Sequence, residues 1–288
     1  MATLREIRRR INSVRSTQQI TKAMKMVAAA KLRRAQENIL ATRPYVHKMK
    51  GILHKLVSQV ELQRHPLLIR PEGGNVLLIG VTADRGLCGA FNSNLIRYME
   101  NVKRSMDDES VSLMTVGRKG SEYFSRRRYD IFYKKVNFFN QLAFSDAREI
   151  VDQVVKVFMA GKFHRIEVIY NEFKSALQQN IVREQILPFM PGGEEAGQTT
   201  QVEYLYEPSR NEILSNLIPK YLNVQMWKVL LESNAAEQGA RMTAMENATE
   251  NAEELIGHLS LTYNRARQAA ITKEISEIVG GAEALKEI

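Results

Sequence analysis

The sequence predicts an α/β protein with a discontinuous organisation: long N- and C-terminal helices pair as an antiparallel coiled coil, and the chain between them forms an α/β domain. Two observations predict this. Apolar residues follow a seven-residue repeat at both ends of the chain, and strand-like apolar runs alternate with helical stretches in the middle. We expect four parts: an N-terminal helix at 1–60, a linker at 61–74, the α/β domain at 75–208 and a C-terminal helix at 209–288.

The N-terminal helix carries the repeat most regularly. With Leu4 as position a and Ile7 as position d, thirteen of the seventeen a and d positions up to residue 60 are apolar. A repeat this long is typical of a coiled-coil seam. Thr3 and Glu6 form a capping box, so the helix is expected to begin at Thr3. Pro44 removes a backbone donor and predicts a kink or a break near residue 43.

Three neighbouring polar residues interrupt this seam: Gln18, Thr21 and Lys25. A fourth interruption, Thr42, lies further along. Because polar side chains at a and d positions weaken helix pairing, we expect the stretch at 18–25 to pair poorly and to present a surface to another molecule.

The C-terminal helix repeats the pattern less regularly. Ser209 and Glu212 form a second capping box, and Pro219 predicts a bend. The seam is then expected to consist of Met242, Met245, Thr249, Ala252, Ile256, Leu259, Tyr263, Ala266 and Ala270, with a slip of register near Thr272. The two helices would measure roughly 85 and 115 Å at ~1.5 Å per residue, too long for a compact globule.

Unequal helix lengths predict an overhang. If the inner ends of the helices are level, roughly twenty residues of the second helix project beyond residue 4. This end carries an apolar stripe with no partner in the chain, which we call the apolar shaft tip: Ile275, Ile278, Val279, Ala282 and Leu285.

The middle of the chain changes periodicity. Apolar runs predict strands at 76–81, 111–116, 131–133 and 166–170, with further candidates at 182–187 and 202–206. Helical stretches are expected around 92–103, 117–125 and 146–160. This alternation indicates a mainly parallel sheet flanked by helices.

The sequence offers no chemistry of its own. The loop at 82–92 follows the first strand, where a doubly wound fold holds a phosphate, but it has neither G-x-G-x-x-G nor G-x-x-x-x-G-K-[ST]. Cys88 is the only cysteine, and the five histidines have no metal-ligand spacing. We therefore expect no catalytic, cofactor-binding or metal-binding residue, and interpret the loop as a structural turn.

The charge is unevenly distributed. The chain has a formal net charge of +9, and by our count residues 1–60 contribute +12, residues 61–208 zero and residues 209–288 −3. A basic coiled coil admits a nucleic-acid-binding or scaffold protein as the alternative class. The positive residues are interleaved with the seam rather than set apart from it, which favours an acidic protein surface as partner. No apolar run approaches the ~20 residues of a membrane span.

Long motifs give the chain a family resemblance. The segments at 6–14 (EIRRRINSV) and 17–31 (TQQITKAMKMVAAAK) resemble the gamma subunits of F-type ATP synthases. So do the loop at 84–89 (DRGLCG) and the segments at 240–249 (ARMTAMENAT) and 263–275 (YNRARQAAITKEI). The resemblance covers the whole chain in order.

The resemblance implies a Rossmann-like central domain and a non-catalytic rotor stalk. Such a stalk turns inside a hexamer of alternating alpha and beta subunits, so that rotation of the membrane c-ring drives conformational change at the beta catalytic sites. The epsilon subunit and the c-ring would contact the central domain and lower shaft. Coupling to beta is implied for Met24, Arg241, Gln268, Thr272 and Glu274.

Two further expectations follow from the family pattern. Chloroplast gamma subunits carry a regulatory dithiol, and with Cys88 alone no thiol switch is expected. The match begins within the first residues, which favours a bacterial chain without a transit peptide, held peripherally on the cytoplasmic side of the inner membrane.

Overall fold

The computed structural model describes residues 3–58, 65–69, 74–106, 110–176, 178–190 and 210–284. The chain forms two compact units, each made from distant parts of the sequence. Residues 1–27 and 242–288 form the coiled-coil unit, and residues 28–241 form the α/β unit. Helices α1 (Leu4–Ser58) and α5 (Arg210–Ala284) contribute to both units. The predicted strand at 202–206, Ser209 of the second capping box, Leu285 of the tip and most of the linker lie outside the described residues.

The first helix begins where its capping box predicts. The Thr3 backbone N–H donates to Glu6 Oε2 at 2.7 Å, and the Glu6 N–H donates to Thr3 Oγ1 at 3.3 Å. The predicted break at Pro44 is wrong, because α1 continues through it to Ser58. Helix α5 likewise continues through Pro219. Buried side chains on both sides of each proline stabilise the helix by more than the lost backbone hydrogen bond costs.

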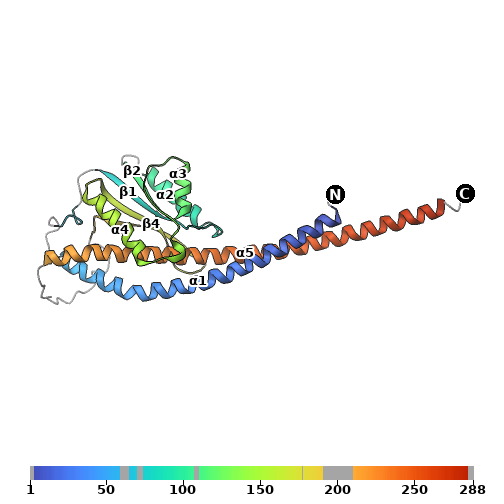
Figure 1. Ribbon diagram of the computed structural model, residues 1–288, viewed down its shortest axis with the longest axis horizontal. Helices are drawn as coiled ribbons and strands as arrows, with labels where there is room; N and C mark the ends of the chain where they lie inside the picture. Colours follow the sequence, from blue (N-terminus) through green and yellow to red (C-terminus); the bar gives the residue numbers. More distant parts are fainter. Residues whose placement is uncertain are drawn as a thin grey trace. The chain divides into compact units, whose positions relative to one another are not determined.

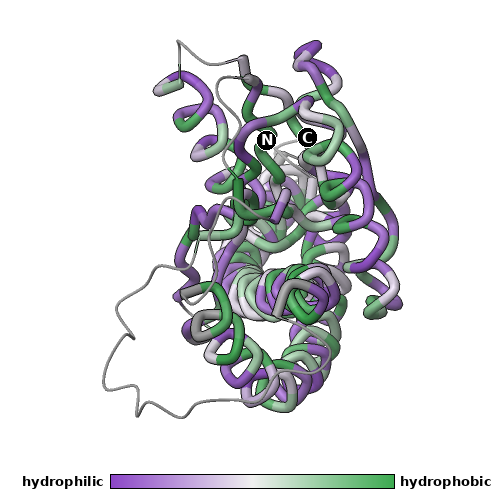
Figure 2. Tube along the Cα trace, turned by 90° about the vertical axis from the view of Figure 1, so that its left-hand side faces the viewer, coloured by the Kyte–Doolittle hydropathy of each residue, from purple (hydrophilic) through white to green (hydrophobic). Residues whose placement is uncertain are grey.

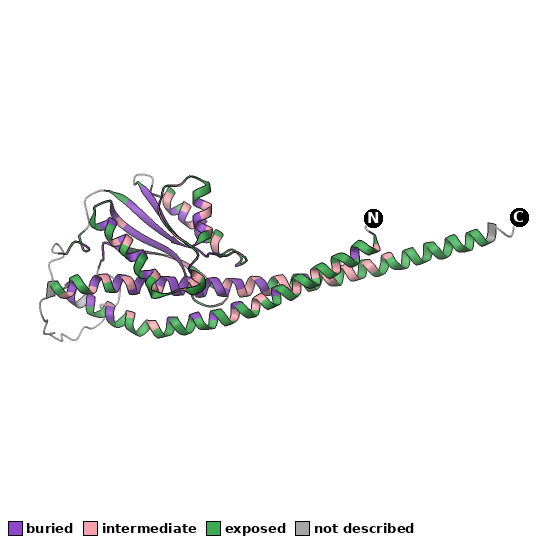
Figure 3. Ribbon diagram, in the orientation of Figure 1, coloured by how far each residue is buried: buried purple, intermediate pink, exposed green. Residues whose placement is uncertain are grey.

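The predicted seam of α1 is confirmed by burial. Every described a and d position from Leu4 to Leu56 is buried or half-buried, the polar ones included, while most other positions of the helix are exposed. In Figure 3 buried and half-buried patches recur at intervals along α1 between exposed segments. Hydrophobic and hydrophilic residues alternate along the helices in Figure 2, as amphipathic packing requires. The repeat therefore predicts which face of α1 is covered.

Five strands form one sheet in the α/β unit, in the order β3-β2-β1-β4-β5. The strands are β1 (Asn75–Val81), β2 (Val111–Val116), β3 (Ile131–Lys135), β4 (Phe163–Phe173) and β5 (Gln179–Leu187). The first four are parallel and β5 pairs antiparallel to β4. This confirms the mainly parallel, Rossmann-like sheet at the predicted positions, and it shows that the strand candidate at 182–187 belongs to an antiparallel edge strand.

Helices cover both faces of this sheet (Figure 1). On one face α2 (Phe91–Arg104) and α3 (Arg118–Arg126) pack on Val76 and Leu78 of β1. On the other face α4 (Phe144–Met159) and the α/β-unit parts of α1 and α5 pack on Leu77 and Ile79. Successive strand residues point to opposite faces, and β1 is buried on both sides from Val76 to Val81.

One carboxylate, Asp84, links the carboxyl ends of β1, β2 and β3. Asp84 follows β1 and is 8% exposed. Its Oδ1 accepts backbone N–H groups from Arg118 at 3.0 Å and Asn137 at 2.8 Å, and its Oδ2 accepts from Phe139 at 3.1 Å. These donors follow β2 and β3. Asp84 therefore takes the backbone amides at the edge where a doubly wound fold holds its phosphate, one of them at the N-terminus of α3.

A glycine lets the chain close tightly beside this carboxylate. Gly117 precedes α3 with a φ of 96°, and a Cβ there would lie 2.0 Å from the Thr82 carbonyl oxygen. The Thr82 hydroxyl in turn accepts the Gly120 N–H at 2.9 Å. The loop at 82–92 is thus bonded to the start of α3, which agrees with its interpretation as a structural turn.

We predict that Asp84→Ala destabilises the α/β unit by about 3 kcal/mol, because three amide donors lose a charged acceptor. Asp84→Asn should lose less, since its carbonyl oxygen can still accept. Chemical denaturation followed by circular dichroism measures both values. Asp152→Ala, an exposed carboxylate on α4, is the matched control. An Asp84→Ala variant as stable as this control would contradict the role given to the carboxylate.

Candidate functional site

The polar residues of the seam form a matched layer within the coiled-coil unit. Thr21 is 8% exposed, and its Oγ1 lies 2.8 Å from Oγ1 of Thr249, the polar exception of the second helix. Four residues further along α1, Lys25 Nζ lies 2.5 Å from Glu246 Oε1. Residue numbers rise on one helix as they fall on the other, so the helices are antiparallel. At Thr21 and Lys25 the expectation that this stretch pairs poorly is therefore wrong, because each side chain has a polar partner on α5.

A polar groove of about 290 Å³ lies beside this layer. Its lining comes from both helices: Gln18, Gln19, Lys22, Lys25, Glu246, Thr249, Glu250 and Glu253. Gln18 is half-buried at its seam position, and Met24 is half-buried on the same stretch of α1. The groove mixes cations and carboxylates, so it offers hydrogen-bonding groups of both kinds rather than a site for one charge.

The C-terminal end of α5 has no cover within the coiled-coil unit. Ala266 is its last half-buried residue, and every residue from 267 to 282 is exposed. This confirms the predicted overhang, which Figure 3 shows as an exposed length of helix beyond the N-terminus. Gln268, Thr272 and Glu274 all lie on it.

An apolar stripe runs along this exposed end. Ile271, Ile275 and Ile278 recur at spacings of four and three residues and are 48%, 55% and 66% exposed; Val279 beside them is 55% exposed. Ala282 continues the stripe and is exposed too. A helical face of this kind is typical of a surface that another protein covers.

The fifth coupling candidate, Arg241, is in a different environment. It is 8% exposed in the α/β unit. One guanidinium nitrogen, Nη2, donates to Glu237 Oε1 at 2.6 Å and to the Gly86 carbonyl oxygen at 3.2 Å, and Nη1 donates to Gln238 Oε1 at 3.2 Å. Arg241 thus ties α5 to the loop that carries Asp84. The loop also packs on α5 through a small apolar cluster that includes Cys88 and Ala236.

This loop presents one apolar side chain outward. Leu87 is 65% exposed and has a φ of 62°, a backbone conformation that is rare for leucine. Two hydrogen bonds anchor the loop just before Leu87, one from the Arg118 N–H to Asp84 and one from Arg241 to the Gly86 carbonyl oxygen. Neither contact was predicted from the sequence. Their partners are 34 to 155 residues distant, so no local pattern signals them.

Cys88 and the potential metal-ligating side chains show no sign of a reactive or metal-binding site in the described residues. Burial raises the pKa of the Cys88 thiol to about 11, which leaves little thiolate at neutral pH. Among the described residues, no group of three or more His, Cys, Asp or Glu side chains has the geometry of a metal site. No helix in those same ranges has the length and apolar character of a membrane span.

We predict that Arg241→Ala destabilises the α/β unit by about 3 kcal/mol, because it leaves the Glu237 carboxylate buried without a counter-charge. Burial already raises the pKa of the Glu237 carboxyl group, although the positive charge and hydrogen bond of Arg241 lower it. Without the arginine this pKa rises further, and a raised carboxyl pKa costs stability as pH increases. The deficit relative to the native chain should therefore shrink between pH 8 and pH 5.

Denaturation at the two pH values tests this. The double variant Glu237→Met with Arg241→Met removes both charges while keeping the volume and should recover much of the loss. A deficit that is independent of pH, or a double variant less stable than Arg241→Ala, would contradict the ion-pair account.

Comparison with known proteins agrees with this geometry. A family model described as ATP synthase matches residues 3–285. The chain is 52% identical to the ATP synthase gamma chain of Chloroherpeton thalassium over 302 residues, covering 100% of this chain and 99% of that one. It is 51% identical to the gamma chain of Chlorobaculum tepidum, with full coverage of both.

Solved structures give the same result. A chain of the central stalk and c-ring structure of Tetrahymena thermophila mitochondrial ATP synthase is 30% identical, with a TM-score of 0.61 over 80% of this chain and 99% of that one. A chain of the Euglena gracilis mitochondrial enzyme shares the fold, with a TM-score of 0.72 at 21% identity over 98% of this chain and 94% of that one. The chain therefore belongs to the family of ATP synthase gamma chains, the non-catalytic subunits of the enzyme's central stalk.

Proposed function

We propose that the chain turns inside a ring of alternating alpha and beta subunits and makes the beta catalytic sites change conformation in sequence. The c-ring drives the rotation, and ATP is made or hydrolysed on the beta subunits. The chain supplies shape, stiffness and contact surfaces rather than catalytic groups. This is consistent with a Rossmann-like sheet whose ligand edge is held by the chain's own Asp84.

The observation that carries the proposal is the uncovered end of α5. An isolated single helix gains no tertiary stabilisation, and burying each large aliphatic side chain contributes about 1.5–3 kcal/mol. The stripe of Ile271, Ile275, Ile278 and Val279 is exposed in the chain alone. A ring of subunits with an apolar inner surface would cover it from all sides and still permit rotation.

Coupling to the beta subunits is assigned to two groups of residues. Met24, Gln268, Thr272 and Glu274 are half-buried or exposed in the coiled-coil unit and are available for direct contact. Arg241 is buried, so its role in coupling is indirect: it holds the loop from which Leu87 projects. The seam residues Gln18, Thr21 and Lys25 stabilise the shaft between these contacts.

The remaining partners follow from the same role. The central domain and lower shaft bind the epsilon subunit and the c-ring, which keeps the chain peripheral on the cytoplasmic side of the bacterial inner membrane. The excess positive charge of residues 1–60, which is +12, supports a surrounding protein with a negatively charged surface. Duplex DNA binding is the alternative for such a helix and would show steep salt dependence.

We predict that a probe attached to the α/β unit rotates on ATP addition when the chain is reconstituted with alpha and beta subunits. ATPase activity should require the assembly, because the isolated chain lacks a catalytic centre. Single-particle rotation with a surface-immobilised ring measures this directly. A probe that stays still in a complex that hydrolyses ATP would overturn the proposal.

We predict that Ile275→Ser combined with Ile278→Ser weakens assembly with the ring by at least about tenfold, because two apolar side chains lose their burial. Titration of labelled chain into alpha and beta subunits gives the affinity. The control is Glu277→Gln, an exposed residue between them outside the stripe. Equal affinities for the two variants would show that the stripe is not the covered surface.

A further inference from the structure

A second concave site lies between α1 and α5 inside the α/β unit. The cavity measures about 250 Å³ and is lined by Ile39, Thr42, Arg43, Val46, His47, Lys50, Lys228 and Leu231. Six of these residues come from three successive turns of α1 and two from α5. None of them belongs to the surfaces to which we assign contact with the beta subunits.

The cavity arises from a small residue at a seam position. Thr42 occupies a d position where Leu or Ile would fill the space between the helices. Its hydroxyl donates to the Asn38 carbonyl oxygen of its own helix at 2.8 Å, so it needs no partner across the seam. Ile39 and Leu231 are buried at the floor, at 5% and 1% exposure. The interior is therefore apolar.

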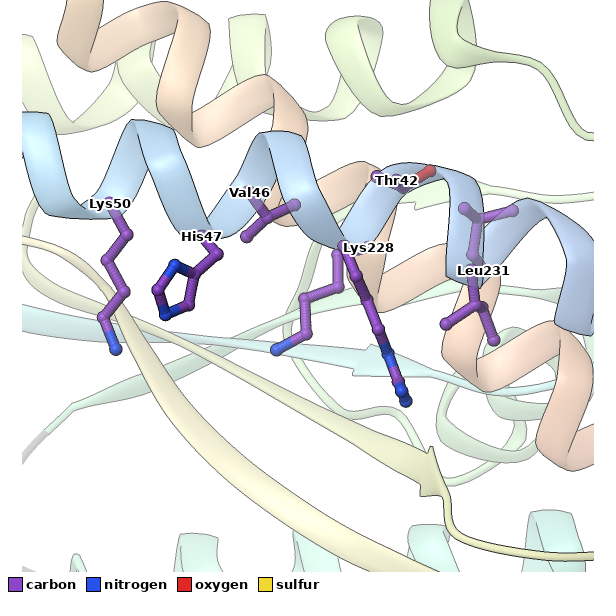
Figure 4. Close-up of a pocket in the computed structure, with 8 residues that line it drawn as sticks. Thr42, Val46, His47, Lys50, Lys228 and Leu231 are labelled. Atoms are coloured by element: carbon purple, nitrogen blue, oxygen red, sulfur yellow. The ribbon is translucent and has the colours of Figure 1, made fainter. Parts of the chain in front are cut away.

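The rim carries positive charge from both helices. Arg43 and Lys50 occupy e positions one heptad apart, which in a coiled coil normally face an opposite charge on the partner helix. Here the facing residue of α5 is Lys228. Within the described ranges, none of these three cations forms an ion pair with a carboxylate. Figure 4 shows His47, Lys50 and Lys228 directed to the same side of α1.

One carboxyl group lies near enough to interact with two of these cations. Burial raises the pKa of the Glu232 carboxyl group, although the positive charges of Lys228 and Arg43 act to lower it. Glu232 is only 4% exposed, and its Oε2 has no hydrogen-bond partner. The raised pKa reduces its value as a counter-charge. The rim therefore keeps a positive potential that no carboxylate among the described residues neutralises through an ion pair.

We propose that this cavity is a binding site for a small amphiphilic anion, a carboxylate or phosphate monoester carried on a short alkyl or aryl body. The apolar body lies on Ile39, Val46 and Leu231, and the anionic head accepts charge-assisted hydrogen bonds from Arg43, Lys50 and Lys228. An engineered apolar cavity of about 150 Å³ holds benzene, so the volume here suits a somewhat larger body. Such a ligand bridges α1 and α5 and stabilises their packing.

Octanoate binding to the purified full-length chain tests the proposal. Isothermal titration and NMR shifts should show saturable binding at one site. Two probes, 1-octanol and acetate, each supply half of the ligand and should bind at least about tenfold more weakly, because each loses either the charged contacts or the apolar ones. Octanoate should also raise the unfolding temperature, and above its dissociation constant the rise should follow the logarithm of its concentration.

Three variants locate the site. Lys228→Gln should weaken octanoate binding about tenfold by removing a charged donor. Thr42→Leu should abolish binding by filling the cavity, while leaving the chain at least as stable as the native form, which separates lost binding from lost folding. Lys48→Gln, an equal charge change at an exposed position of α1 outside the lining, is the matched control and should bind normally.

Several results would overturn the proposal. These are an octanoate affinity no greater than that of octanol, binding that does not saturate, or equal binding by Thr42→Leu and the native chain. All of these measurements use the chain without other subunits, so their failure leaves the rotor proposal untouched.

Discussion

The pairing of α1 with α5 is the interaction on which the rest of the structure depends. Both helices contribute to each compact unit, and the a and d positions of α1 are buried or half-buried in both. In the α/β unit this pair also covers one face of the sheet, with Leu53 and Leu230 fully buried. In the coiled-coil unit a polar layer replaces part of the apolar seam. The Thr21–Thr249 contact favours this register, because a shift of α5 by one heptad would place the apolar Met242 or Ile256 opposite Thr21.

A second constraint explains why a sheet of nucleotide-binding topology has no ligand motif. In such sheets the backbone amides at the carboxyl ends of the strands face the phosphate of a ligand. Here Asp84 accepts three of those N–H groups, and the adjoining loop is held to α5 by Arg241. This edge is thereby occupied by the chain's own side chain, where a dinucleotide enzyme leaves it open to the ligand.

Much of this was accessible from the sequence because it rests on periodicity. The seven-residue repeat predicted the buried face of α1, and the apolar runs placed the five described strands to within a few residues. The errors have one cause, which is tertiary packing. It keeps α1 continuous through Pro44, and it matches Lys25 with Glu246 instead of leaving the stretch unpaired. Arg241 has no local signal of burial, because its partner Gly86 is brought near only by the completed fold. In the sequence, the only sign of the cavity at Thr42 is a polar residue at a seam position.

The central proposal is that α1 and α5 keep a fixed antiparallel register in the coiled-coil unit while the chain rotates. A disulfide between Cys residues placed at positions 21 and 249 tests it most directly, through the variant Thr21→Cys with Thr249→Cys. Their hydroxyl oxygens are 2.8 Å apart in the native chain, and the native Cys88 is buried, with a pKa of about 11 that leaves it unreactive at neutral pH. The account predicts rapid oxidation to the intramolecular disulfide, and ATP-driven rotation of the reconstituted complex that is the same before and after oxidation. Failure of the disulfide to form, or loss of rotation once it has formed, would contradict the account.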